Sequence, residues 1–140
     1  MVTMPCLEFV SPDLTHDQKQ LIATGLTDAF VDITGFEREI FGIHFITYGA
    51  GGAAQGGVMW DGSTGRPMVH LLFYSPRFDR EIKQALVIKF TNVVKDVIGD
   101  PAWKPVIHLN EHPYDNIGVD GEILSDRHEE LRERKFYYDL

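Results

Sequence analysis

The sequence predicts one α/β (α+β) domain in which two consecutive β-α-β units form a four-stranded mixed sheet with two helices on one face. Two observations predict this fold. The chain contains an internal repeat, and each copy has an apolar strand, an amphipathic helix and a second apolar strand. A chain of 140 residues is also long enough for one domain with a substantial hydrophobic core.

The repeat becomes visible when the segment that begins at Phe9 is aligned, without gaps, with the segment that begins at Phe73. Between Phe9 and His44 ten aligned pairs are identical, whereas unrelated sequences would share about two. The identical pairs are Phe9/Phe73, Ser11/Ser75, Pro12/Pro76, Lys19/Lys83, Gln20/Gln84, Thr27/Thr91, Asp32/Asp96, Gly35/Gly99, Ile43/Ile107 and His44/His108. Within one domain of residues 1–140 we therefore expect halves at about 5–48 and 67–112, and a C-terminal tail at 119–140.

Local signals place the elements within each half. Apolar runs predict strands at residues 6–10, 40–48, 69–74 and 105–110, and a Ser-Pro pair ends the first and the third. The helices have clear end signals: a capping box at Thr15 and Gln18, a cap at Asp79, and C-terminal glycines at Gly35 and Gly99. A right-handed crossover makes the two strands of each unit parallel.

Two segments lie outside these units. The glycine-rich residues 49–66 predict a flexible connection containing a hairpin, which is either a simple linker or a loop bordering a pocket or a neighbouring subunit. The acidic residues 120–133 are most simply a solvated surface helix.

The predicted strands are apolar on both faces, although two helices cover only one face. In residues 40–48 one face carries Phe41, Ile43 and Phe45, and the other carries Ile40, Ile46 and Tyr48. A sheet with two apolar faces needs a second cover, so we expect further copies of the chain to supply it.

Composition excludes several classes of protein. A net charge of −8 argues against nucleic-acid binding, and no apolar run reaches the length of about 18 residues that a membrane span needs. Cys6 is the only cysteine, which excludes an intrachain disulfide and favours a reducing cytoplasm. The first nine residues lack the basic and apolar regions of a secretory signal.

Pro5 opens the first strand directly after Met4, whereas the equivalent residue in the second half is Val69. With the tandem β-α-β units, this pattern resembles the tautomerase superfamily. It is most similar to the long fused members, malonate semialdehyde decarboxylase and cis-3-chloroacrylic acid dehalogenase, over about residues 5–121. The resemblance implies a tautomerase-like (MIF-like) fold, a homotrimer whose sheets face inward, no cofactor, and a small carboxylate-bearing substrate.

In this superfamily the chemistry depends on an amino-terminal proline. The usual pKa of an α-amino group is about 7.7–8.0, and an apolar pocket lowers it by disfavouring the cation. The resemblance therefore implies that Pro5 acts as a general base or acid near neutral pH. Pro5 has a free amine only in a chain that begins at this residue; otherwise it is a proline that opens a strand.

Two further residues match functional positions of the fused members. Arg77 follows the second Ser-Pro turn, where an arginine binds the substrate carboxylate in the relatives. Glu39 matches the catalytic aspartate of the decarboxylase, which polarises the substrate or a water. The alternatives are a solvated turn arginine and a surface carboxylate paired with Arg38.

Other parts of the relatives' pattern are missing. Phe30 stands where the dehalogenase has a helix histidine, Asp115 stands where the decarboxylase has a pocket tryptophan, and a second arginine near the turn is absent. The candidates that line the pocket instead are Tyr74, His108, Tyr114 and Asn116.

The histidines suggest architecture before chemistry. His44 and His108 are equivalent in the repeat, which favours core or interface positions. His108, Glu111 and His112 lack a recognised zinc spacing, so no metal is expected. Two functions remain: an enzyme of the tautomerase type, with decarboxylation or hydration as variants, and a non-catalytic oligomer that binds a ligand or a protein partner.

Overall fold

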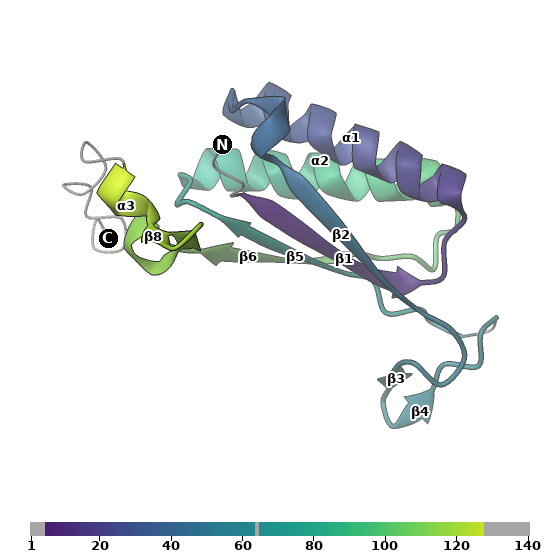
Figure 1. The fold of residues 1–140 in the computed structure, drawn as a ribbon. Helices are drawn as coiled ribbons and strands as arrows, with labels where there is room; N and C mark the ends of the chain where they lie inside the picture. The colour runs from purple at the N-terminus through teal and green to yellow at the C-terminus, as the bar shows by residue number, and fades with distance from the viewer. Residues whose placement is uncertain (1–4, 64, 128–140) are drawn as a thin grey trace.

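The computed structural model describes residues 5–63 and 65–127 (Figure 1). The main sheet consists of β1 (Cys6–Pro12), β2 (Gly42–Tyr48), β5 (His70–Ser75) and β6 (Val106–Glu111). The long helices α1 (His16–Thr34) and α2 (Arg80–Ile98) lie side by side on one face of this sheet. The short elements are η1 (Arg38–Ile40), β3 (Ala54–Gln55), β4 (Val58–Met59), η2 (Tyr114–Asn116), β7 (Gly118–Val119), β8 (Glu122–Ile123) and α3 (Leu124–Arg127).

The sheet has the strand order β2-β1-β5-β6. Each β-α-β unit contributes a parallel pair, and β1 and β5 join the two units in antiparallel orientation. The predicted mixed four-stranded sheet with two helices on one face is therefore confirmed. This register also places the first residues of β1 and β2 at the same end of the sheet as the last residues of β5 and β6. We call this end of the sheet the Pro5 end.

The helix boundaries follow the local signals in the sequence. The Thr15 hydroxyl accepts a hydrogen bond from the Gln18 backbone N–H at 3.1 Å, and the Gln18 side chain accepts one from the Thr15 N–H at 2.9 Å. Asp79 caps α2 through the N–H of Ile82 at 3.1 Å. Gly35 and Gly99 end the helices with φ values of 72° and 70°, a conformation in which a Cβ atom is unfavourable.

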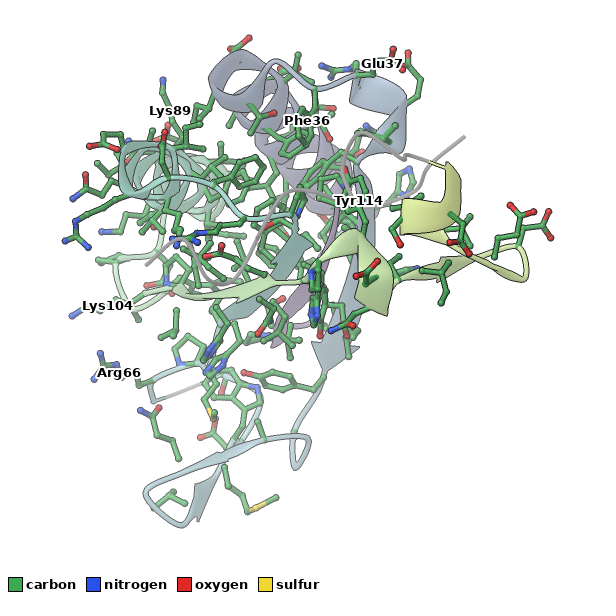
Figure 2. All side chains as sticks on the ribbon, turned by 90° about the vertical axis from the view of Figure 1, so that its left-hand side faces the viewer. Phe36, Glu37, Arg66, Lys89, Lys104 and Tyr114 are labelled. Carbon is green, nitrogen blue, oxygen red and sulfur yellow. The ribbon has the colours of Figure 1, made fainter. Side chains whose placement is uncertain are left out.

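The core lies between the helices and the sheet face that they cover. Its fully buried side chains alternate along the strands and recur at helical spacing in the helices: Leu7, Phe9, Ile22, Leu26, Phe30, Leu71, Phe73, Leu86, Phe90 and Val94. The ring of Phe30 stacks on Phe41 with centroids 4.5 Å apart. By contrast, the charged side chains of Arg66, Lys89 and Lys104 are exposed and extend outward (Figure 2).

The repeat extends beyond the sheet to the two hairpins. In the alignment of the two copies, strands β3 and β4 of the first correspond to β7 and β8 of the second. The turn residues 56–57 have φ values of 58° and 80°, and the equivalent residues 120–121 have φ values of 51° and 83°. Because each pair is left-handed, both hairpins close through the same kind of tight turn. The hairpin expected within residues 49–66 is therefore present, and it belongs to the first copy.

Equivalent hydrogen bonds close the base of each hairpin. The backbone N–H of Trp60 donates to the carbonyl of Ala53 at 2.8 Å, and that of Leu124 donates to the carbonyl of Ile117 at 2.8 Å. The alignment of the two copies also pairs Ala53 with Ile117 and Trp60 with Leu124. The two hairpins are therefore one structural unit that occurs twice.

The expected solvated helix over residues 120–133 is wrong in its first part. Asp120 and Gly121 form the hairpin turn, whose positive φ angles are incompatible with a right-handed helix. Helix α3 begins only at Leu124, whose side chain is 1 % exposed. Residues 128–133 lie outside the described residues.

The sheet face opposite the helices, which we call the open face, is not covered by the described residues (Figure 1). The register places Glu8 between His44 on β2 and Leu72 on β5. Ile46 and Val106 on this face are 46 % and 49 % exposed. That other copies of the chain cover the open face stays a prediction.

Candidate active site at the Pro5 end

Six of the seven predicted site residues lie at the Pro5 end of the sheet. Pro5 directly precedes β1, and Glu39 lies in η1 just before β2. Arg77 is the second residue after β5, and Tyr114 is the first residue of η2 after β6. Because β1 pairs antiparallel with β5, residues from the chain's beginning and middle meet at this edge.

Pro5 is buried at the start of the sheet. Its carbonyl accepts a hydrogen bond from the backbone N–H of Gly42 at 3.4 Å, which extends the β1–β2 pairing by one residue. A proline is compatible with this position because the first residue of a strand need not donate to the ladder. The buried residues Leu7 and Phe9 follow at alternate positions, so the surroundings on this side of the strand are apolar.

Arg77 sits in a partly buried turn. It lies between the buried residues Pro76 and Phe78, and it is itself neither fully buried nor fully exposed. Asp79, two residues after Arg77, caps the N-terminus of α2, so the start of this helix sets the position of the turn. The strand on one side and the helix on the other therefore fix the backbone of this turn, and a carboxylate-binding role for Arg77 stays a prediction.

Glu39 is exposed, so its carboxylate is accessible to a small molecule. The alternative in which it pairs with Arg38 is wrong, because the Arg38 guanidinium lies 2.7 Å from the carboxylate of Asp28 on α1. Both side chains of that ion pair are about half exposed (48 % and 54 %), so we expect it to add little to stability.

Tyr74 points to the open face rather than into the core. Its neighbours are Cys6 in register on β1, Glu8 two residues further along the same strand, and His112, whose ring stacks on it with centroids 6.1 Å apart. A hydrogen bond to the Glu8 carboxylate raises the pKa of the Tyr74 hydroxyl, with smaller contributions from burial and from the negative charge of Glu8. The tyrosine is therefore a neutral hydrogen-bond donor at neutral pH.

The remaining predicted pocket residues separate into two places. Tyr114 is partly buried and Asn116 is exposed, and both belong to η2 at the Pro5 end. His108 is exposed in the middle of β6, opposite Leu72, where its ring stacks on that of His70 at 5.5 Å. The structure therefore does not bring His108 to the Pro5 end, and it places neither His44 nor His108 in the core.

Cys6 lies at the start of β1, next to Pro5, and its side chain is partly buried. Burial raises the pKa of the Cys6 thiol, and the Glu8 carboxylate adds to the effect, so the reactive thiolate is disfavoured. Within residues 5–63 and 65–127 no group of three or more His, Cys, Asp or Glu side chains could hold a metal ion.

Reasoning from the sequence missed Glu8 and His112 as neighbours of Tyr74. Their signal was available in part, because Glu8 is the one charged residue in an apolar strand. His112 aligns with Tyr48 of the first copy, so the repeat also marked it as the equivalent of an aromatic residue. Neither pattern reveals the cross-strand partner, because that depends on the antiparallel pairing of β1 with β5.

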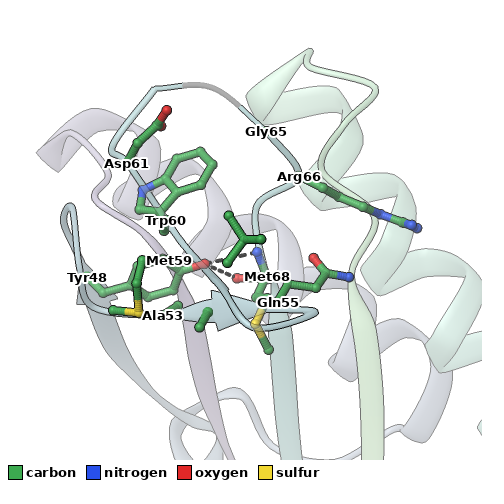
Figure 3. Close-up of a pocket in the computed structure, with 11 residues that line it drawn as sticks. Tyr48, Ala53, Gln55, Met59, Trp60, Asp61, Gly65, Arg66 and Met68 are labelled. Carbon is green, nitrogen blue, oxygen red and sulfur yellow. Dashed lines mark hydrogen bonds between the residues drawn. The ribbon is translucent and has the colours of Figure 1, made fainter.

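A hollow of about 330 Å³ lies at the opposite end of the sheet, under the β3–β4 hairpin (Figure 3). It is lined by residues of β2, the hairpin and the segment that leads into β5. The Tyr48 hydroxyl donates to the carbonyl of Met68 at 2.5 Å and accepts from its N–H at 3.0 Å (Figure 3). This hollow is remote in the sheet from Pro5, Glu39 and Arg77.

Comparisons with known proteins agree with this architecture. Residues 67–127 match the family described as "Tautomerase enzyme". No curated protein matches the chain in sequence. Among the described residues, no helix combines the length and the apolar composition needed to cross a bilayer.

Several solved structures share the fold. A fused 4-OT described as a wild-type asymmetric trimer is 20 % identical, with a TM-score of 0.77 over 88 % of this chain and 98 % of its own. A native fused 4-OT is 22 % identical, with a TM-score of 0.74 over 87 % and 98 %. A member of the cis-3-chloroacrylic acid dehalogenase (cis-CaaD) family is 20 % identical, with a TM-score of 0.69 over 89 % of both chains.

These likenesses agree with the pattern of Pro5, Val69 and the tandem β-α-β units. The resemblance found in the sequence is thereby confirmed: residues 67–127 match the tautomerase family, and the chain has the fold of the fused members of the tautomerase superfamily.

Proposed function

We propose that the chain is a tautomerase-type enzyme that uses the Pro5 amine as general base and acid on a small keto, enol or unsaturated carboxylic acid. The observation that carries the proposal is that Pro5 and Arg77 lie at the same end of the sheet. A buried proline opens β1 at the edge where β5 leads into a partly buried arginine. An amine in apolar surroundings favours its neutral, proton-accepting form, and a guanidinium suits a carboxylate.

The simplest reaction is the interconversion of an enol and its ketone. The neutral Pro5 nitrogen accepts the proton of the enol hydroxyl and the carbonyl forms. The carbon next to this carbonyl then takes a proton back from the resulting ammonium. No proton is gained or lost overall. Decarboxylation and addition of water to an unsaturated acid are variants that would use the same two groups.

The other residues of the Pro5 end have supporting roles in this proposal. Arg77 binds the carboxylate through its two parallel N–H groups. The exposed Glu39 carboxylate polarises the substrate or a water, and Tyr74, Tyr114 and Asn116 line the pocket. We assign no contact with the substrate to His108 from within the same chain, because it lies in the middle of β6.

We further propose that the protein is a cytoplasmic homotrimer. Fused 4-OT structures with this fold are described as trimers, and they match the chain over nearly their full length. The uncovered open face with its exposed Ile46 and Val106 supports burial against other copies. The single cysteine supports a reducing compartment.

The second candidate is a non-catalytic oligomer that binds a ligand or a partner. The observation that favours it is the presence of four residues before Pro5 in the sequence, because an acylated proline nitrogen has no basicity. The two candidates therefore differ in one property, the chemical state of a single nitrogen.

The test is the mature amino-terminus combined with an activity assay. We expect intact mass of the natively expressed protein to show a chain that begins at Pro5, and this chain to convert phenylenolpyruvate to phenylpyruvate. Pro5→Ala should lose the activity, Arg77→Gln should raise KM, and the exposed Lys104→Gln should change neither. A chain that retains Met4, or full activity in Pro5→Ala, would refute the proposal.

A further inference from the structure

We propose that the hollow under the β3–β4 hairpin is a second, non-catalytic ligand site that binds a small aromatic carboxylate. The internal repeat makes this hollow the counterpart of the Pro5 end. The β3–β4 hairpin is followed by Met68 and Val69, which directly precede β5. The equivalent β7–β8 hairpin follows β6 in the second copy, whose first strand, β5, pairs with β1. In the sequence, Met68 and Val69 correspond to Met4 and Pro5.

The equivalence explains why this site would bind without reacting. Val69 replaces Pro5 and lies within the chain, so its nitrogen is an amide with no basicity. Its side chain is 1 % exposed and forms part of the core. The residue equivalent to Arg77 is Asp13, so the carboxylate-binding arginine of the Pro5 end is also absent here. A ligand in the hollow must therefore be recognised by different side chains.

The hollow offers a preformed surface for an aromatic ring. Its lining includes the Trp60 indole, the Tyr48 ring and the thioethers of Met59 and Met68, all of which make favourable contacts with a planar ring (Figure 3). Both hydrogen bonds of the Tyr48 hydroxyl go to the backbone of Met68, which fixes the tyrosine in place. The volume of about 330 Å³ lies within the range of small-molecule sites.

The opening of the hollow carries one cation and one anion. Arg66 lines it and extends to the outside, where its exposed guanidinium is accessible to a carboxylate (Figures 2 and 3). The Asp61 carboxylate accepts a hydrogen bond from the backbone N–H of Ser63 at 2.9 Å, so part of its hydrogen-bonding capacity is used within the loop. We assign the choice of ligand charge to Arg66, because its guanidinium can bind both oxygens of a carboxylate, so an acid should be preferred to an amine.

The hairpin is rigid enough to hold such a site. The N–H of Gly51 donates to the carbonyl of Trp60 at 2.8 Å, and the N–H of Trp60 donates to the carbonyl of Ala53 at 2.8 Å. These bonds and the tight turn at residues 56–57 hold the indole against the hollow before a ligand arrives. A preorganised wall lowers the entropy lost on binding.

The experiment compares two probes with the same ring and opposite charge. Isothermal titration calorimetry with phenylacetate and with phenethylamine is carried out on the full chain carrying Pro5→Ala and Arg77→Gln, which removes binding at the Pro5 end. We expect saturable binding of phenylacetate, at least about tenfold tighter than that of phenethylamine. Because this background lacks the proposed catalytic groups, the result does not depend on whether the Pro5 proposal is correct.

Variants of the hollow locate the binding. In the same background, Arg66→Gln should weaken phenylacetate binding about tenfold and bring its affinity close to that of phenethylamine. Trp60→Leu should weaken both probes, and the exposed Lys104→Gln should change neither. Circular dichroism confirms that each variant is folded. The proposal is overturned if neither probe saturates, if phenethylamine binds as tightly as phenylacetate, or if Arg66→Gln binds like its parent.

Discussion

Replacing Phe41 by alanine tests whether the aromatic core supports the Pro5 end. Phe41 lies between η1 and β2, directly after the turn that carries Glu39, and its side chain is 8 % exposed. Its ring stacks on Phe30 at 4.5 Å and contacts Phe73 at 6.0 Å and Phe90 at 6.4 Å. The residue therefore joins both helices to the sheet.

The expected magnitude follows from this burial. Truncating a buried phenylalanine to alanine costs about 3–5 kcal/mol, because transfer free energy is lost and a cavity remains. Three aromatic contacts place Phe41→Ala in the upper part of this range. Such a loss is a large fraction of the stability of a typical domain, which is about 5–15 kcal/mol.

Phe45→Ala is the matched control. Phe45 lies on β2, four residues further along the chain; it is only partly buried and has one aromatic contact, with Phe9 at 5.6 Å. We expect its truncation to cost about half as much, because less apolar surface is lost from the interior. Urea unfolding followed by circular dichroism, at one protein concentration for all variants, gives the free energies. A loss below about 1 kcal/mol in Phe41→Ala, or one no larger than in Phe45→Ala, would refute this account of the core.

Three further predictions concern single contacts. Tyr48→Phe removes the hydroxyl that bonds both backbone groups of Met68, so urea unfolding should show a loss of about 1–3 kcal/mol, and an unchanged midpoint would contradict it. Gly99→Ala should lower the free energy of unfolding by about 1–2 kcal/mol, because residue 99 has a φ of +70°, which disfavours a Cβ atom even where no other atom lies within 4 Å of it. Gly99→Asn should cost less in the same assay, because asparagine tolerates this conformation. Glu8→Gln should lower the pKa of Tyr74 in a spectrophotometric titration, since the parent hydroxyl has its pKa raised by this carboxylate. The stability that the raised Tyr74 pKa contributes is fully present below a pH of about 10 and is lost as the pH rises through the raised pKa. An unshifted titration in Glu8→Gln would show that the hydrogen bond is absent.

The sequence by itself determined the local architecture of this protein. The internal repeat, the capping box at Thr15 and the glycines at positions 35 and 99 specified two β-α-β units and the ends of their helices. These features depend on residues close together in the chain, and their physical causes are hydrogen bonds at helix ends and the spacing of apolar side chains. They could therefore be read without knowledge of the neighbours in space.

Only the tertiary structure decided which residues meet. The antiparallel pairing of β1 with β5 brings the start of the chain to the turn that holds Arg77, and it places Tyr74 beside Glu8. Arg38 pairs with Asp28 on α1 rather than with the adjacent Glu39. Such partners are distant in sequence, and they are selected by the way both helices bury their apolar sides on one face of a single sheet.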